Sequence, residues 1–194
     1  RFWFATLRNV DLTNANLVDV DFRYTAMENV NFKGATLQNV LIPRSVLVNV
    51  NFSDATLSDV RFSGSLLDKS NFEGAVLDHV ETLGSFFLKN NFKNSEIKNT
   101  DFKRVKILTA DFSTTEFKNV VFESSMFSSA DFSDVDFSSI KIKSGVAFSD
   151  SLFVGSNFLE NELPETDFTQ KTFYNCKTLG WKESITRIDD NPII

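Results

Sequence analysis

Residues 50–64, VNFSDATLSDVRFSG, carry a large apolar residue at Phe52, Leu57 and Phe62, one every five residues. A small or β-branched residue precedes each of these centres by two positions, and Asp or Gly follows it by two. A period of five matches neither the helical period of about 3.6 nor the strand period of about 2. It therefore indicates a repeat architecture in which each unit makes one short extended side and one tight corner.

The same period continues through nearly the whole chain. Twenty-nine centres lie between Phe2 and Ile142, and all of them except Thr82 are apolar. After Lys143 the register shifts by one residue, and six centres follow, namely Phe148, Phe153, Phe158, Leu163, Phe168 and Phe173. We interpret the shift, near residues 144–147, as a one-residue bulge in a continuous stack rather than as a domain boundary.

The types of the centres repeat every twenty residues, which predicts four units per coil. One column is almost entirely Phe and reads Leu12, Phe32, Phe52, Phe72, Phe92, Phe112, Phe132, Phe153 and Phe173. The column ten residues away lies on the opposite wall, and the two remaining walls begin with Leu. Coils stacked by strand-type hydrogen bonds lie about 4.8 Å apart, so we expect an elongated rod with a continuous core.

This pattern resembles that of the pentapeptide-repeat family, A-[DN]-L-x-x, and the resemblance covers thirty-five units. It implies an all-β fold, a right-handed quadrilateral β-helix of about nine coils. We expect this β-helix to span residues 1–177. A short capping helix and an exit linker are expected over residues 178–194, where Trp181, Ile185 and Ile188 recur at helical spacing.

The composition is that of a soluble chain of single-domain length, with 194 residues, 42% hydrophobic residues and no apolar run long enough to cross a membrane. We expect no membrane association. Because the first residue is Arg1 and not Met, and Phe2, Trp3 and Phe4 crowd the first unit, we interpret the chain as cut from a larger protein or processed. The single cysteine, Cys176, excludes a disulfide framework and suits a cytoplasmic compartment.

The sequence offers little for chemistry. It contains no HExxH, P-loop, GxSxG or paired-cysteine motif, so we expect no catalytic residue, cofactor or metal in this chain. We interpret His79 as a solvated corner residue and Cys176 as a buried structural thiol. A column of Asp and Asn, from Asp11 to Asp131, is expected to hydrogen-bond with corner backbone groups and with itself.

One wall breaks the rule that residues beside the centres are polar. Its flanking positions include Phe86 near the middle, and the adjoining wall adds further apolar residues along the shared edge. We also expect the polar centre Thr82 to distort its coil and to push the Phe86 ring outward. Such a contiguous apolar surface indicates protein docking, either by a partner or by another part of the same polypeptide. The predicted docking residues are Leu41, Val46, Val48, Leu66, Leu83, Phe86, Leu88, Leu108 and Met126.

These features favour a non-catalytic protein-binding module of a larger protein. Because a second copy of the chain would also be a protein partner, self-association is an open alternative. By architecture it is similar to the β-helix of the HECT-type ubiquitin ligases that bacterial pathogens inject into host cells, which would place it in the bacterial cytoplasm or in the host cell. The alternative is a DNA-mimic protein that binds DNA gyrase. The net charge of −6 permits that alternative, but basic side chains are scattered along the rod. The same charge disfavours nucleic-acid binding.

Overall fold

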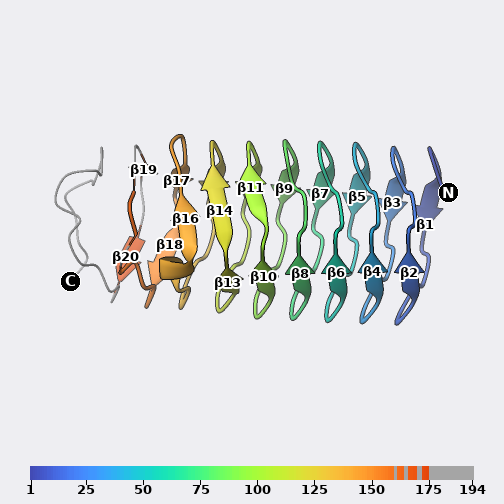
Figure 1. The fold of residues 1–194 in the computed structure, drawn as a ribbon, viewed down its shortest axis with the longest axis horizontal. Coiled ribbons are helices and arrows are strands. Elements are labelled where there is room, and N and C mark those ends of the chain that lie inside the picture. The colour runs from blue at the N-terminus through green and yellow to red at the C-terminus, as the bar shows by residue number, and fades with distance from the viewer. Residues whose placement is uncertain (160, 164–165, 170–171, 175–194) are drawn as a thin grey trace.

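The computed structural model describes residues 1–159, 161–163, 166–169 and 172–174. Over these residues the chain winds into a rod of stacked coils, with the first residues at one end (Figure 1). Each coil has four sides, and each side contributes to one of four walls that run along the rod. The expected capping helix at 178–194 lies outside the described residues.

The first wall is a sheet of nine parallel strands, which we call the nine-stranded wall. Each coil supplies one strand, so eight full turns separate the first strand from the last. Every strand is three residues long, and its middle residue is the apolar centre of the repeat. In order along the rod the strands are β1 (Thr6–Arg8), β3 (Ala26–Glu28), β5 (Val46–Val48), β7 (Leu66–Asp68), β9 (Phe86–Leu88), β12 (Lys106–Leu108), β15 (Met126–Ser128), β17 (Ala147–Ser149) and β19 (Asp167–Thr169).

The third wall, on the opposite side of the core, is a six-stranded parallel sheet. It consists of β2 (Asn16–Val18), β4 (Thr36–Gln38), β6 (Thr56–Ser58), β8 (Val76–Asp78), β10 (Glu96–Lys98) and β13 (Glu116–Lys118). In the next coil a 3₁₀ turn, η1 (Phe137–Ser139), takes the place of the strand.

The second and fourth walls are joined mainly by single parallel bridges. The second wall carries the Phe column and ends in β18 (Leu152–Val154) and β20 (Thr172–Tyr174). The fourth wall becomes a three-stranded sheet of β11 (Asp101–Lys103), β14 (Val120–Glu123) and β16 (Ile140–Ile142). The four walls confirm the predicted β-helix.

The register confirms both the coil length and the shift. Thr6 pairs with Ala26, twenty residues on, whereas Met126 pairs with Ala147, twenty-one residues on. The extra residue lies in the corner at 143–146, where Gly145 has φ +74°, and the N–H of Ser124 donates to Ser144 O at 3.1 Å. The stack is therefore continuous, as predicted, but the extra residue enlarges a corner instead of forming a bulge within a strand.

The corners explain why turn-forming residues recur two positions after each centre. From Phe4 to Asp134 every such residue has a positive φ, in the left-handed region. This conformation costs an L-residue with a Cβ about 1–2 kcal/mol, and Asn, Asp and Gly tolerate it best. Ser139 is the exception, because it lies in η1, where the Asp136 carboxylate accepts a hydrogen bond from Ser138 N.

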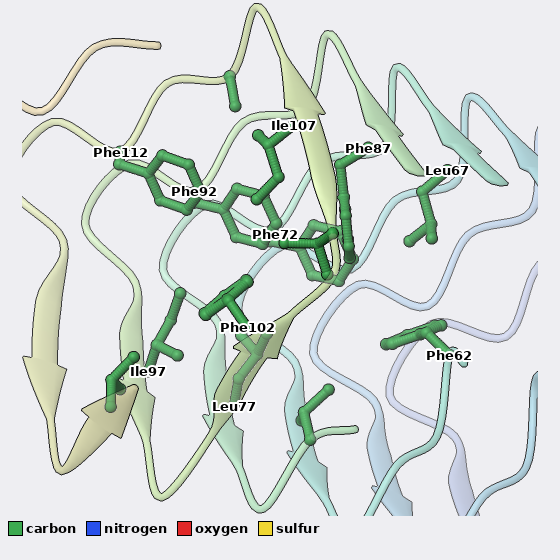
Figure 2. Packing of buried hydrophobic residues seen from close by; sticks show 14 of the residues in the cluster. Phe62, Leu67, Phe72, Leu77, Phe87, Phe92, Ile97, Phe102, Ile107 and Phe112 are labelled. Atoms are coloured by element: carbon green, nitrogen blue, oxygen red, sulfur yellow. The ribbon is translucent and has the colours of Figure 1, made fainter. Parts of the chain in front are cut away.

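The centres form ladders of buried side chains inside the rod. Phe32, Phe52, Phe72, Phe92 and Phe112 stack with centroids 4.7–5.0 Å apart and nearly parallel rings. The part of this ladder from Phe72 to Phe112 is shown in Figure 2, beside the aliphatic and aromatic centres of the other walls. Ring spacing thus equals coil spacing, so each ring contacts its neighbours as closely as the backbones do.

Polar side chains replace the small residue before the centre at several places and are buried there. Ser65 Oγ donates to Ile42 O at 2.7 Å, and Ser85 Oγ donates to Phe62 O at 2.8 Å. Asn90 Nδ2 donates to Leu67 O at 3.0 Å, and Asn90 Oδ1 accepts from the N–H of Ser70. These bonds reach backbone groups one coil away and therefore tie neighbouring coils together.

The predicted distortion around Thr82 is wrong. Thr82 is 2% exposed, and its Oγ1 donates to Asp101 O at 3.0 Å, which satisfies the polar group inside the core. The corner hydrogen bond from Ser85 N to Thr82 O measures 3.0 Å, as in other coils, and Phe87 is buried. Phe86 faces outward only because successive residues of a strand alternate between the two faces of the sheet.

The Phe ladder predicts the effect of a charge at its middle. Phe72→Asp buries an unpaired carboxylate between the rings of Phe52 and Phe92, which costs more than a marginally stable fold can tolerate. We expect the variant to lose its cooperative thermal transition in circular dichroism. A folded Phe72→Asp rod would contradict the ladder.

The corner geometry makes a second prediction, because Thr109 is β-branched, exposed and held at φ +56°. Thr109→Asn is expected to raise the free energy of unfolding by about 1 kcal/mol, since Asn tolerates the left-handed region. The matched control is Thr36→Asn, at an exposed strand position of β4, where no gain is expected. Urea unfolding of both variants measures the difference, and equal effects would refute the explanation.

Candidate docking surface

Seven of the predicted docking residues lie on the outer face of the nine-stranded wall. Strand pairing places Val46 beside Leu66 and Leu66 beside Phe86, and it places Leu88 beside Leu108. Seven of the ten outward positions on the five strands β5, β7, β9, β12 and β15 are therefore apolar. We call the seven residues the apolar strip: Val46, Val48, Leu66, Phe86, Leu88, Leu108 and Met126.

The strip is exposed to different degrees along the rod. Val46 and Met126, at its two ends, are 44% and 42% exposed. Leu66, Phe86 and the other strip residues are half-buried by their neighbours in adjacent coils. The middle of the strip is thus less exposed than its two ends.

The structure places Leu41 and Leu83 at opposite edges of the fourth wall. Leu41 is bridged to Asp21 and Arg61 and precedes the centre Ile42, so it lies at the edge away from the nine-stranded wall. The expectation that Leu41 lies along the shared edge is therefore wrong. Leu83 follows the centre of its side and lines a hollow of about 380 Å³ with Glu81, Asp101 and Lys103, among others. Only Gly84 and Ser85 separate it from Phe86 in the chain, and its contribution to the docking surface stays a prediction.

Two charged residues interrupt the strip. Lys106 stands between Phe86 and Met126 in one column, and Asp68 stands between Val48 and Leu88 in the other. Asp68 Oδ1 is shielded from solvent and has no hydrogen-bond partner within the described residues. A shielded acceptor without a donor is costly, by about 1–3 kcal/mol.

The sequence interpretation missed a group of aromatic residues at the corner that leads into this wall. Phe4 and Tyr24 are 73% and 40% exposed, have positive φ, and stack with ring centroids 4.9 Å apart. Arg44, in the next coil, donates to the Tyr24 hydroxyl at 3.0 Å. The missed signal is the residue type, because these corner positions normally hold Asn, Asp or Gly.

The Asp and Asn column on the second wall has the structural role that was predicted. Asn51 Nδ2 donates to Asn31 Oδ1 at 2.9 Å, so neighbouring coils are linked. Asn51 Oδ1 also accepts from the N–H of Ser53 two residues ahead, and Asn31 Oδ1 accepts from Lys33 N in the same way. The oxygens of this ladder are used by the fold itself.

Charged side chains on the other walls pair mostly between adjacent coils. On the fourth wall Arg61 Nε lies 3.3 Å from Glu81, and Lys143 Nζ lies 3.0 Å from Glu123. On the third wall the carboxylate of Glu96 accepts from Lys118 Nζ at 3.0 Å, which lowers the pKa of Glu96. Both signs alternate along these walls, and among the described residues no wall presents a long stripe of one sign.

His79 lies at a corner, as predicted. Its side chain is 60% exposed, and Nδ1 lies 2.7 Å from the Asp78 carboxylate. It lines a hollow of about 310 Å³ with Arg61, Glu81 and other polar residues. Across the described ranges no group of His, Cys, Asp or Glu has an arrangement that could hold a metal ion. Cys176 lies outside those ranges.

The described part of the chain contains no helix with the length and apolar character needed to cross a bilayer. Its one helical segment is the 3₁₀ turn of three residues.

A coil of four five-residue sides, with an apolar centre on each side and a left-handed corner residue after it, defines the class of pentapeptide-repeat β-helices. The family model for pentapeptide repeats matches residues 1–39, 31–68, 45–81 and 110–141, in eight copies. These ranges together cover more than half of the chain, so the chain belongs to the pentapeptide-repeat family.

Two solved structures match this chain at low sequence identity. HetL, a protein involved in heterocyst differentiation regulation from the cyanobacterium Nostoc, is 18% identical, with 90% of this chain and 85% of HetL covered and a TM-score of 0.35. The trypsin-treated fluoroquinolone resistance protein QnrB1 is 16% identical over 94% of this chain and 87% of QnrB1, with a TM-score of 0.45. No curated protein matches the sequence.

An acid-sensitive contact lies near the aromatic corner. Asp21 is nearly buried, and this burial alone would raise its pKa, but hydrogen bonds from Arg23 and Trp3 outweigh it and lower the pKa to about 2. Arg23 Nη2 lies 2.8 Å from the Asp21 carboxylate, and the guanidinium carbon lies 5.0 Å from the Trp3 ring centroid. The carboxylate thus holds Arg23 against the aromatic ring.

We expect this contact to make stability depend on pH in a defined window. A carboxyl group with a depressed pKa in the folded state stabilises the fold above its unfolded pKa, near 4, and this contribution is lost as the pH falls towards 2. Asp21→Asn should therefore be less stable than the wild type at pH 7 and should lose less stability between pH 4 and pH 2. Denaturant unfolding at several pH values tests this, and parallel pH profiles would contradict it.

Proposed function

We propose that this chain is a non-catalytic protein-binding module that docks its partner on the apolar strip. The observation that carries the proposal is the in-register run of outward apolar side chains on β5, β7, β9, β12 and β15. Outward positions of this repeat have no structural need for apolar residues, because the core is filled by the centres. Contiguous exposed apolar patches on soluble domains are typical of protein interaction sites.

The middle of the strip has the features of an energetic centre. Phe86 lies between Leu66 and Lys106 on the neighbouring strands, and Leu88 follows it on the same face of β9. A large aromatic side chain that is already ordered by its neighbours loses little entropy on binding. Aromatic anchors near the centre of an interface typically contribute most of its affinity.

The charge pattern gives less support to the alternative of a gyrase-binding DNA mimic. A DNA mimic needs acidic side chains in long rows, whereas acidic residues on the fourth wall pair with Arg61, Lys103 and Lys143 in adjacent coils. The acidic members of the Asp and Asn column are separated by Asn at its middle. The remaining net charge of −6 is small for a surface that replaces duplex DNA.

The finer proposal is that the module is the substrate-binding β-helix of a bacterial HECT-type effector ligase. It rests on architecture alone, and the gene sequence after Ile194 tests it directly. A ligase lobe encoded there is the expected result. A different domain or a stop codon would remove the ligase proposal and leave the docking proposal unchanged.

The docking proposal predicts that Phe86→Ala combined with Leu66→Ser abolishes partner binding and leaves the rod folded. Truncation of the aromatic anchor alone is expected to cost about 2 kcal/mol or more of binding. Thermal stability should fall only slightly, because both side chains lie outside the core ladders. Binding is measured by calorimetry with a partner recovered by the wild-type rod.

The matched control is Val76→Ser on β8, a half-buried outward position of the opposite wall. It should bind as the wild type does. If the double variant unfolds, or if it binds as tightly as the control, the strip is not the docking site.

A further inference from the structure

We infer that the partner presents an amphipathic α-helix whose apolar face is flanked by acidic residues, and that this helix lies along the rod axis on the apolar strip. This inference rests on the proposed docking function and adds the chemistry and shape of the partner. It is carried by the distribution of unpaired cations and by the geometry of the nine-stranded wall.

Five cationic side chains without an ion pair surround the strip. Arg44 and Arg104 occupy the corner before the wall, Lys69 and Lys89 occupy the corner after it, and Lys106 lies within the strip itself. All five are exposed. The ion pairs within the described residues involve none of them.

Cations elsewhere on the described part of the rod are mostly paired, for example Lys98 with Glu96 and Lys103 with Asp101. The exceptions away from the nine-stranded wall are Arg1, Lys93 and Lys141. A protein with a net charge of −6 thus carries a group of unpaired basic side chains around the apolar strip. Only Asp68 opposes this charge from within the strip. Complementary rim charges orient a partner and accelerate its association.

The geometry excludes a partner strand on this face. The backbone N–H and C=O groups of β5, β7, β9, β12 and β15 already pair with the coils on either side. A bound segment must therefore contact the wall through side chains. On one face of a helix, residues separated by three or four positions advance about 5.2 Å per step, close to the coil spacing of about 4.8 Å.

This near match allows one apolar helix residue per coil along the strip. Over the five coils the two periods diverge by only about 2 Å, less than half of one coil spacing. A helix about 10 Å wide also covers the two columns of the strip and leaves its flanks over the corners. Acidic residues on those flanks would meet Arg44 and Arg104 on one side and Lys69 and Lys89 on the other.

The surface fits an anionic membrane less well. Membrane-binding faces insert large apolar side chains into the bilayer, whereas Phe86 and Leu66 are half-buried against the sheet. The exposed strip residues, Val46 and Met126, lie at its two ends. A strip with a less exposed middle and charged borders is better matched to a rigid helix.

The test is a selection of helical peptides of about 18 residues, long enough to cover five coils, from a random display library on the wild-type rod. Counter-selection on Phe86→Ala with Leu66→Ser retains only peptides that need the strip. We expect the enriched sequences to combine an apolar stripe at helical spacing with Asp or Glu on both sides. Their affinity should weaken as salt is raised, because exposed charges are screened.

Charge variants then measure the contribution of the unpaired cations directly on the best peptide. Lys69→Glu with Lys89→Glu is expected to raise the Kd about tenfold. The control, Lys93→Glu with Lys141→Glu, reverses two unpaired, exposed cations on the second and fourth walls and should change the Kd less than twofold.

Three outcomes would overturn the inference, and they differ in what they leave standing. Strip-dependent peptides with neutral or basic flanks would refute the acidic helix and retain docking on the strip. Strip-dependent binding to phosphatidylserine vesicles, without peptide enrichment, would replace the helix with a membrane. A selection that yields no strip-dependent peptide and no vesicle binding would refute the proposed docking function as well.

Discussion

Every feature of this rod depends on the parallel hydrogen bonds between coils, which fix the coil spacing and the twenty-residue register. Such bonding requires the chain to turn sharply four times per coil while it advances by only one coil spacing. The left-handed residue at each corner accomplishes this turn, at a conformational cost that Asn, Asp and Gly keep small. Once the spacing is set, rings such as Phe52 and Phe72 stack at the same interval, and the core follows from the backbone.

The fold was largely predictable from the sequence, because the residue types within each five-residue unit determine its extended side and its corner. The centres and corners recur at fixed spacing in the sequence, and the extra residue after Lys143 is recognised as a shift of that spacing. The register of β15 with β17, twenty-one residues apart, agrees with this shift. Thr82 was misjudged for a different reason. Its hydroxyl is satisfied by the carbonyl of Asp101, a partner in the next coil that no local pattern identifies.

The candidate site was predictable only in part. Strand alternation correctly places Phe86 and the rest of the strip on the outer face. It does not show which cations are already paired. Arg44, Lys69, Lys89 and Arg104 differ from most cations on the other walls in having no ion pair, and this difference depends on the three-dimensional structure. Ion-pair partners come from the same coil as well as from adjacent coils, and their geometry depends on side-chain conformations.

The buried hydrogen bonds of the core share one direction along the rod. Ser65, Ser85 and Asn90 each donate to a backbone carbonyl twenty-three residues earlier, in the preceding coil. A coil that adds to a stack growing from the N-terminal end therefore finds the acceptors for these side chains already in place. A stack growing from the other end would bury the same groups before their partners arrive, which is costly. The chemistry of a few core positions thus favours assembly of the rod in the order in which the chain is synthesised.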